Sequence, residues 1–261
     1  MPPLNCGVSR TDVTAMKRAL YDRIGIGYAE RRRPDPRIEA RIDSALGSCD
    51  RVLNVGAGAG SYEPANRFII AVEPSAEMIR QRPAESAPVV QASASRLPFR
   101  DQSFDAALAV LSVHHWAHRE QGLAEMRRVA RERVVIFTWD PEHSGFWLVQ
   151  QYFPEILAID RPAFPSLREI ETIIGHAISS VVPVPADCSD GFLGAYWQRP
   201  AHYLDVHVRN AISSFSKFDS TTGLSRLRRD LDDGTWLSKN ATLQDLRELD
   251  IGYRLVVAEC A

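Results

Sequence analysis

The chain has 261 residues, of which 45% are hydrophobic and 25% charged, and 31 basic and 33 acidic side chains give a net charge of -2. This composition is typical of a soluble folded protein and excludes a disordered tail, a collagen and a coiled coil. The only basic run is Arg31, Arg32 and Arg33, which argues against binding to a nucleic-acid backbone. The length suffices for one large core, so we expect one α/β unit with additions.

The four cysteines, Cys6, Cys49, Cys188 and Cys260, are far apart in the sequence. This spacing fits neither a C-x-x-C metal site nor a disulfide framework, and it predicts reduced thiols and no metal centre. The N-terminus does not have the pattern of a secretory signal, and no apolar run reaches the length of a membrane-spanning helix. We therefore expect a cytoplasmic protein that is not bound to a membrane.

The first half of the chain alternates between helical and strand patterns. A helix is expected over residues 13–21, and Asp35 with Pro36 predicts a second helix that Gly47 ends. Further helices are expected over residues 75–82 and around residues 123–130. The expected strands cover residues 51–55, 68–72, 88–91, 106–113 and 133–138. Strands that alternate with helices at this spacing predict right-handed crossovers and a mostly parallel sheet with helices on both faces.

The alternation is lost from Pro141 onward, where aromatic residues accumulate, and this change predicts a helical, aromatic cap. Two later runs, residues 179–184 and 253–258, read as strands that extend the edge of the sheet. We therefore expect one domain over residues 1–261. Its predicted parts are an N-terminal lid (1–33), a cofactor-binding core (34–140), a substrate cap with a late strand (141–250) and a final strand (251–261).

A glycine-rich loop follows the first expected strand. Gly56, Gly58 and Gly60 lie within five residues, and the missing Cβ atoms let the backbone turn sharply and lie against a ligand. Glu73 ends the second strand, where a carboxylate accepts hydrogen bonds from the two hydroxyls of a ribose. Together they predict a nucleoside site at the carboxyl edge of the sheet.

The details of this loop discriminate among nucleotides. The glycines run G-x-G-x-G and are followed by Ser61, so they do not complete the G-x-G-x-x-G fingerprint of dinucleotide sites, and NAD becomes the weaker hypothesis. No Gly-Lys-Ser/Thr follows, which disfavours a kinase or an ATPase.

Three segments carry a family resemblance: residues 52–61, residues 71–75 and residues 95–105. They resemble class I S-adenosyl-L-methionine-dependent methyltransferases, most closely the small-molecule branch (methyltransferase type 11) that includes the quinone C-methyltransferases. The resemblance covers roughly residues 28–140. It implies a Rossmann-like, mostly parallel, seven-stranded sheet, S-adenosyl-L-methionine as the cofactor, and methyl transfer to an oxygen, nitrogen or carbon atom of a small-molecule acceptor.

The resemblance also implies which residues contact the cofactor. Gly56, Ala57 and Gly58 would lie under its methionine part, Glu73 would hold its ribose, and Arg32 would pair with its carboxylate. In the family an acid usually binds the adenine amino group, and Ser93 stands in its place here. The full implied set is Tyr28, Arg32, Asn54, Gly56, Ala57, Gly58, Glu73, Pro74, Ser75, Met78, Ser93, Ala94 and Ala109.

Methyl transfer from a sulfonium depends mainly on the alignment of nucleophile, methyl group and sulfur, and it needs a base only when the acceptor loses a proton. His114 and His115 follow the fourth strand, at the rim where the methyl group should point. Imidazole suits proton transfer near neutral pH, so we predict His115 or His114 as the base, with a structural cap as the alternative. The strand does not end in an Asn/Asp-Pro-Pro-aromatic loop, which argues against methylation of bases and glutamines.

Four residues are candidate walls of the acceptor pocket: Trp116, Trp139, Asp140 and Trp147. The aromatic residues of the cap favour an apolar or aromatic acceptor. The expected partners are thus a small molecule, with no nucleic acid and no membrane, for a monomer or homodimer. Two alternatives stay open: an NAD(P)-dependent oxidoreductase that uses the same loop and acid, and a non-catalytic protein that binds S-adenosyl-L-methionine.

Overall fold

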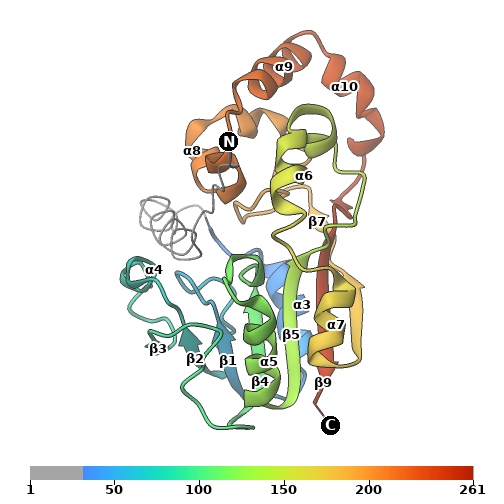
Figure 1. The fold of residues 1–261 in the computed structure, drawn as a ribbon. Helices are drawn as coiled ribbons and strands as arrows, with labels where there is room; N and C mark the ends of the chain where they lie inside the picture. Colours follow the sequence, from blue (N-terminus) through green and yellow to red (C-terminus); the bar gives the residue numbers. More distant parts are fainter. Residues whose placement is uncertain (1–31, 261) are drawn as a thin grey trace, which may run out of the picture.

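The computed structural model describes residues 32–260, so the predicted helix over residues 13–21, Tyr28 and most of the predicted lid lie outside the described residues. The described part is built on a seven-stranded sheet in the order β3-β2-β1-β4-β5-β9-β6 (Figure 1). Strands β1 to β5 pair in parallel, and β9 runs antiparallel between β5 and β6. The strands are β1 Arg51–Val55, β2 Phe68–Val72, β3 Val89–Val90, β4 Phe104–Val110, β5 Ala130–Trp139, β6 Ala177–Val181 and β9 Tyr253–Glu259. The predicted Rossmann-like, mostly parallel sheet is confirmed.

Helices cover both faces of this sheet. Helix α3 (Pro36–Leu46) lies on one face, while α5 (Arg119–Val129) and α7 (Leu167–Ile174) pack together on the other (Figure 1). Helix α3 begins where predicted, because Asp35 accepts a hydrogen bond from the Arg37 backbone N–H, and it ends at Gly47. The short helix α4 (Ala76–Arg80) follows β2.

The side chains of each central strand alternate between two buried clusters. Val52 of β1 and Val135 of β5 face the α3 side, whereas their neighbours Leu53 and Val134 belong to the cluster on the α5 and α7 side. A sheet buried on both faces explains why these strands read as nearly continuous apolar runs in the sequence.

The cap lies beyond the carboxyl ends of the parallel strands (Figure 1). Its helices are α6 Pro154–Asp160, α8 Val206–Asn210, α9 Thr221–Asp232 and α10 Thr235–Lys239. Its short helical turns are η2 Leu148–Tyr152, η3 Pro200–Leu204, η4 Ser213–Lys217 and η5 Ala241–Leu243. Strands β7 Val184–Pro185 and β8 Glu248–Leu249 pair as a two-stranded antiparallel ribbon. A further turn, η1 Val113–His115, follows β4. Within residues 32–260, the helices are all too short or too polar to cross a bilayer.

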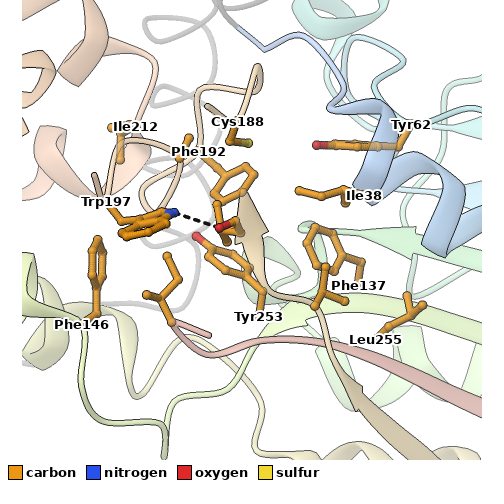
Figure 2. Packing of buried hydrophobic residues seen from close by; sticks show 14 of the residues in the cluster. Ile38, Tyr62, Phe137, Phe146, Cys188, Phe192, Trp197, Ile212, Tyr253 and Leu255 are labelled. Atoms are coloured by element: carbon orange, nitrogen blue, oxygen red, sulfur yellow. Dashed lines mark hydrogen bonds between the residues drawn. The ribbon is translucent and has the colours of Figure 1, made fainter. Parts of the chain in front are cut away.

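One buried cluster runs without a break from the α3 face of the sheet into the cap. Figure 2 shows Phe137 of β5 and Tyr253 of β9 near Phe192, and Trp197 beyond them. The Trp197 indole N–H donates to the carbonyl of Val184 at 2.8 Å, which satisfies its buried donor. The cap and the sheet therefore share apolar core.

Several expected strands have different bounds in the structure, and two of the differences have a clear backbone cause. The run over residues 179–184 splits into β6 and β7, because Pro183 has no N–H to donate to a ladder. The run over residues 106–113 ends at Val110, since Leu111 takes a left-handed conformation (φ 46°) and η1 begins at Val113. This turn brings both histidines to the edge of the sheet.

Candidate cofactor and acceptor site

The glycine loop folds back over the end of β2. The backbone N–H groups of Gly56 and Ala57 both donate to the Val72 carbonyl, at 2.8 and 3.0 Å. Gly56 and Gly58 have φ values of 73° and 52°, which side chains rarely adopt. A Cβ on Gly56 would lie 2.7 Å from the Cβ of Ser112. The loop therefore requires glycine at these positions, and both glycines are half-buried.

Glu73 is held beside this loop by backbone donors. Its side chain is buried, with the residue 7% exposed, and its two oxygens accept the N–H groups of Gly58 at 2.9 Å and Ser75 at 2.8 Å. Each carboxylate oxygen keeps the capacity for a second hydrogen bond. The carboxylate is thus oriented in advance to accept from a pair of neighbouring hydroxyls.

The acid–base state of Glu73 should control cofactor binding. Burial raises the pKa of this carboxyl above its ordinary value, although the N–H groups of Ser75 and Gly58 act in the opposite direction. Only the deprotonated form accepts hydrogen bonds on both oxygens, so the affinity for S-adenosylhomocysteine is expected to be full at neutral pH and to fall as the pH is lowered through this raised pKa. Calorimetric titrations between about pH 5 and 8 measure the fall, and Glu73→Gln should remove it. A wild-type affinity that does not change with pH would contradict this role.

A network of buried polar side chains contacts the glycine loop. Asn54 donates to Glu63 at 3.1 Å, and Glu63 forms an ion pair with Arg82 at 2.8 Å in which the two side chains are 8% and 4% exposed. Arg82 also donates to the carbonyls of Gly58 at 3.3 Å and Ala87 at 3.0 Å. These contacts of Asn54, Glu63 and Arg82 therefore connect β1 and the segment after α4 to the glycine loop.

The other residues of the predicted cofactor set occupy different environments. Met78 is buried and its Cε lies 3.3 Å from a Cβ built on Gly58, while Ser75 caps α4. Ser93 is exposed and hydrogen-bonds to Ser95. Ala57 and Ala94 are buried, Pro74 is exposed, Ala109 is fully buried within β4, and Tyr28 lies outside the described residues. Their contacts with the cofactor stay predictions.

Arg32 lies where the start of the described chain meets the cap. Its guanidinium contacts both carboxylate oxygens of Asp190, at 2.6 and 3.3 Å, and Asp190 also accepts from the Tyr62 hydroxyl at 2.9 Å. In this arrangement Arg32 binds the cap, so its pairing with the cofactor carboxylate stays a prediction.

A cavity lies between the rim of the sheet and the cap, and it encloses about 720 Å³, solvent at its mouth included. Ligand pockets of enzymes have mostly apolar walls with a few polar groups. The sheet and its rim contribute Leu111, His114, His115, Trp139 and Tyr253 to the cavity wall. The cap contributes mainly apolar residues and one acid, among them Phe146, Val149, Ile156, Leu157, Asp160, Phe164, Phe192, Leu193, Ile212 and Ser214. Figure 2 shows Phe146, Phe192, Ile212 and Tyr253 in the surrounding core.

Both predicted catalytic histidines reach this cavity. The His114 ring stacks on Phe164, with ring centroids 3.9 Å apart and an angle of 14°, and it lies 3.7 Å from the His115 centroid. Phe164 also meets Trp139 edge to face at 5.4 Å. These aromatic contacts fix the orientation of the imidazoles at the cavity wall.

Only one of the four residues predicted for the acceptor lines the cavity, namely Trp139. Trp116 packs against the glycine loop and α5, since its ring is 3.0 Å or less from Cβ atoms built on Gly56 and Gly122. Trp147 is 2% exposed and donates to the Trp197 carbonyl, and Asp140 caps the following turn. Acceptor contacts by these three residues stay predictions.

The residues at the loop fit S-adenosyl-L-methionine. Glu73 offers two acceptors for a ribose beside the loop, and the soft apolar side chain of Met78 lies next to Gly58. The buried Oδ1 of Asn54 has no hydrogen-bond partner among the described residues, which leaves an acceptor beside the loop. Fold and site define an α/β protein that binds a nucleoside cofactor.

Comparisons with known proteins identify the family. The methyltransferase domain family matches residues 53–138. A crystal structure from Anabaena variabilis, of a methyltransferase assigned provisionally to an antibiotic biosynthesis pathway, is 33% identical with a TM-score of 0.79, and the match covers 86% of this chain and 97% of that one. The chain belongs to the class I S-adenosyl-L-methionine-dependent methyltransferases.

Curated relatives match over shorter stretches. Demethylmenaquinone methyltransferase of Mycobacterium sp. (strain KMS) is 32% identical over 120 residues, which are 43% of this chain and 52% of that protein. A tRNA (carboxymethyluridine(34)-5-O)-methyltransferase of Arabidopsis thaliana is 28% identical over 143 residues, 52% of this chain and 35% of that protein. The chain thus spans about half or less of these relatives, and they differ in their acceptors.

Sequence reasoning missed several residues of the site. Phe164 is one of several aromatic residues after Pro141 and carries no motif, and neither does the Glu63–Arg82 pair. Asp160 had one usable signal: it lies four residues after Ile156, on the same face of α6, so an acid there faces the apolar side of the helix.

Proposed function

We propose that the chain transfers a methyl group from S-adenosyl-L-methionine to a small apolar or aromatic acceptor bound between sheet and cap. The observation that carries this proposal is the position of His114 and His115. They follow β4, next to the glycine loop that β1 carries, and they line the cavity under the cap. Cofactor cradle and acceptor cavity therefore meet at the carboxyl edge of the sheet.

The cofactor supplies an electrophilic methyl group on sulfur when it is bound. The protein's own residues bind and orient: Glu73 and the loop from Gly56 to Gly58 hold the cofactor, and the aromatic walls position the acceptor and exclude water. An acceptor with an acidic proton loses it to one of the two histidines. His115 or His114 is proposed as that base.

The nature of the cavity favours a small molecule over a nucleic acid. Its walls are mostly aromatic and aliphatic, and the net charge of -2 offers no excess of basic residues for a phosphate backbone. We propose no nucleic-acid or membrane partner, a monomer or homodimer, and a cytoplasmic location. The predicted division into lid, core, cap and final strand belongs to the same proposal.

Methyl transfer to a panel of phenols, quinones, amines and carboxylic acids tests the function. Incubation with S-adenosyl-L-methionine labelled in its methyl group should place label on at least one aromatic member, and none should appear on tRNA. Binding of S-adenosylhomocysteine without transfer to any member would favour the non-catalytic alternative. NAD bound in its place would favour the oxidoreductase.

The pH profile of kcat/KM for a labelled phenol tests the base. We expect kcat/KM to fall on the acid side of the profile, because a protonated base accepts no proton. His115→Gln or His114→Gln should remove this limb while the affinity for S-adenosylhomocysteine stays within about twofold of the wild type. If the acid-side fall of kcat/KM persists in both single variants and in the double variant, these residues are excluded as the base.

A further inference from the structure

The cap wall of the cavity contains one buried acid, Asp160, the last residue of α6. Asp160 is 4% exposed and lines the cavity together with Ile156 and Leu157 of the same helix. Burying a carboxylate is costly unless it is paired and hydrogen-bonded. An acid in an otherwise apolar wall is therefore a point of polar recognition in a ligand site.

Two side chains from η4 stabilise this acid. Ser214 donates its hydroxyl hydrogen to Oδ2 at 2.6 Å, and Lys217 donates to Oδ1 at 3.3 Å. Ser214 lines the cavity with Asp160, whereas Lys217 is not part of the wall. Lys217 thus pairs with Asp160 without lining the cavity, and each carboxylate oxygen of Asp160 keeps the capacity to accept a further hydrogen bond.

This cluster offers acceptors to a ligand. The Ser214 hydroxyl has already donated its hydrogen, so its oxygen can only accept another hydrogen bond, as can both oxygens of Asp160. The neighbouring Ser213 hydroxyl is neutral, and Arg32, which also lines the cavity, is ion-paired with Asp190. A ligand group placed here must donate. A carboxylate or phosphate would be repelled, and an ether has no hydrogen to give.

We propose that the methyl acceptor is an uncharged aromatic compound with a second hydroxyl group, separate from the atom that is methylated, and that Asp160 and Ser214 select this hydroxyl. The inference rests on the proposed function. Lys217 already neutralises Asp160, so a hydroxyl gains more here than a second cation. The ring is accommodated by the walls that Phe146, Phe164 and Phe192 provide.

Three rigid compounds of similar size test the selection: 2,6-dihydroxynaphthalene, 6-methoxy-2-naphthol and 6-hydroxy-2-naphthoate. Calorimetry in the presence of S-adenosylhomocysteine should show the diol binding at least about tenfold more tightly than the ether and the carboxylate, because only the diol can donate to Asp160 and at the same time keep a second hydroxyl at the site of methyl transfer. Equal affinities of the wild type for all three, or no binding of the diol, would overturn the inference.

The variant Asp160→Asn assigns the selection to the side chain. Its amide donates as well as accepts, so the preference for the diol should shrink to about threefold or less. A merely structural role would weaken all three compounds equally and keep the preference. Asp232→Asn, at an exposed position of α9, is the matched control and should keep the wild-type preference.

Ser214→Ala provides a second variant in case Asp160→Asn does not fold, and its preference for the diol should also decrease. Binding of S-adenosylhomocysteine separates the two proposals. Failure of the wild type to bind it would overturn the proposed function itself. Normal binding of it without discrimination among the naphthalenes would overturn only the role of Asp160 and Ser214.

Discussion

Replacing Glu73 with alanine is expected to weaken the binding of S-adenosylhomocysteine by about a hundredfold or more. The carboxylate is held by Gly58 and Ser75 with both oxygens able to accept from the ribose hydroxyls. Hydrogen bonds to a charged group contribute about 1.5–3 kcal/mol each, and each 1.4 kcal/mol corresponds to a tenfold change in affinity. Calorimetric titration measures the loss directly.

Two further variants make this result specific. Glu85→Ala removes an exposed acid close in sequence to α4 and should leave the affinity unchanged. Glu73→Gln keeps the shape and one acceptor, so its loss should be intermediate. An affinity for Glu73→Ala within about threefold of the wild type would exclude Glu73 as the group that binds the ribose.

Replacing Arg82 with methionine is expected to lower the free energy of unfolding by about 3–5 kcal/mol. This change leaves Glu63 as a buried charge whose remaining donors are Asn54 and the Ala87 N–H, and breaking a buried pair from one side has a cost of this size. The carbonyl of Gly58 also loses a donor, so the affinity for S-adenosylhomocysteine should decrease. Urea denaturation measures the stability.

Helix α4, which ends just before Arg82, offers a matched control. Arg80 forms an ion pair with Glu77, but its side chain is 68% exposed, so Arg80→Met should cost less than about 1 kcal/mol. The double variant Arg82→Met/Glu63→Gln should regain much of the lost stability, because it removes the unpaired charge. Equal losses in Arg82→Met and Arg80→Met would show that the buried pair has no special role.

The core of the fold could be predicted from the sequence because local signals there are strong. Asp35, Pro36 and Gly47 mark both ends of α3, and the apolar run from Arg51 to Val55 is β1. The two late strands were also expected at the sheet edge. The arrangement of the cap could not be predicted, because its helices are short and its aromatic residues lack a single period.

The site was predictable where it depends on backbone geometry. A glycine loop followed by an acid at this edge of a sheet is typical of a nucleoside site, so Gly56, Gly58 and Glu73 could be predicted together. The acceptor side depends on contacts between residues far apart in the sequence. Phe164 stacks on His114, and Asp160 meets Ser214, only because the cap folds over the sheet.

Calorimetric titration with S-adenosylhomocysteine, with NAD as the control ligand, tests the central claim most directly. The account predicts that the wild-type protein binds S-adenosylhomocysteine with a dissociation constant of about micromolar order and does not bind NAD. Binding of NAD with no binding of S-adenosylhomocysteine would contradict the assignment of the loop and Glu73 to this cofactor.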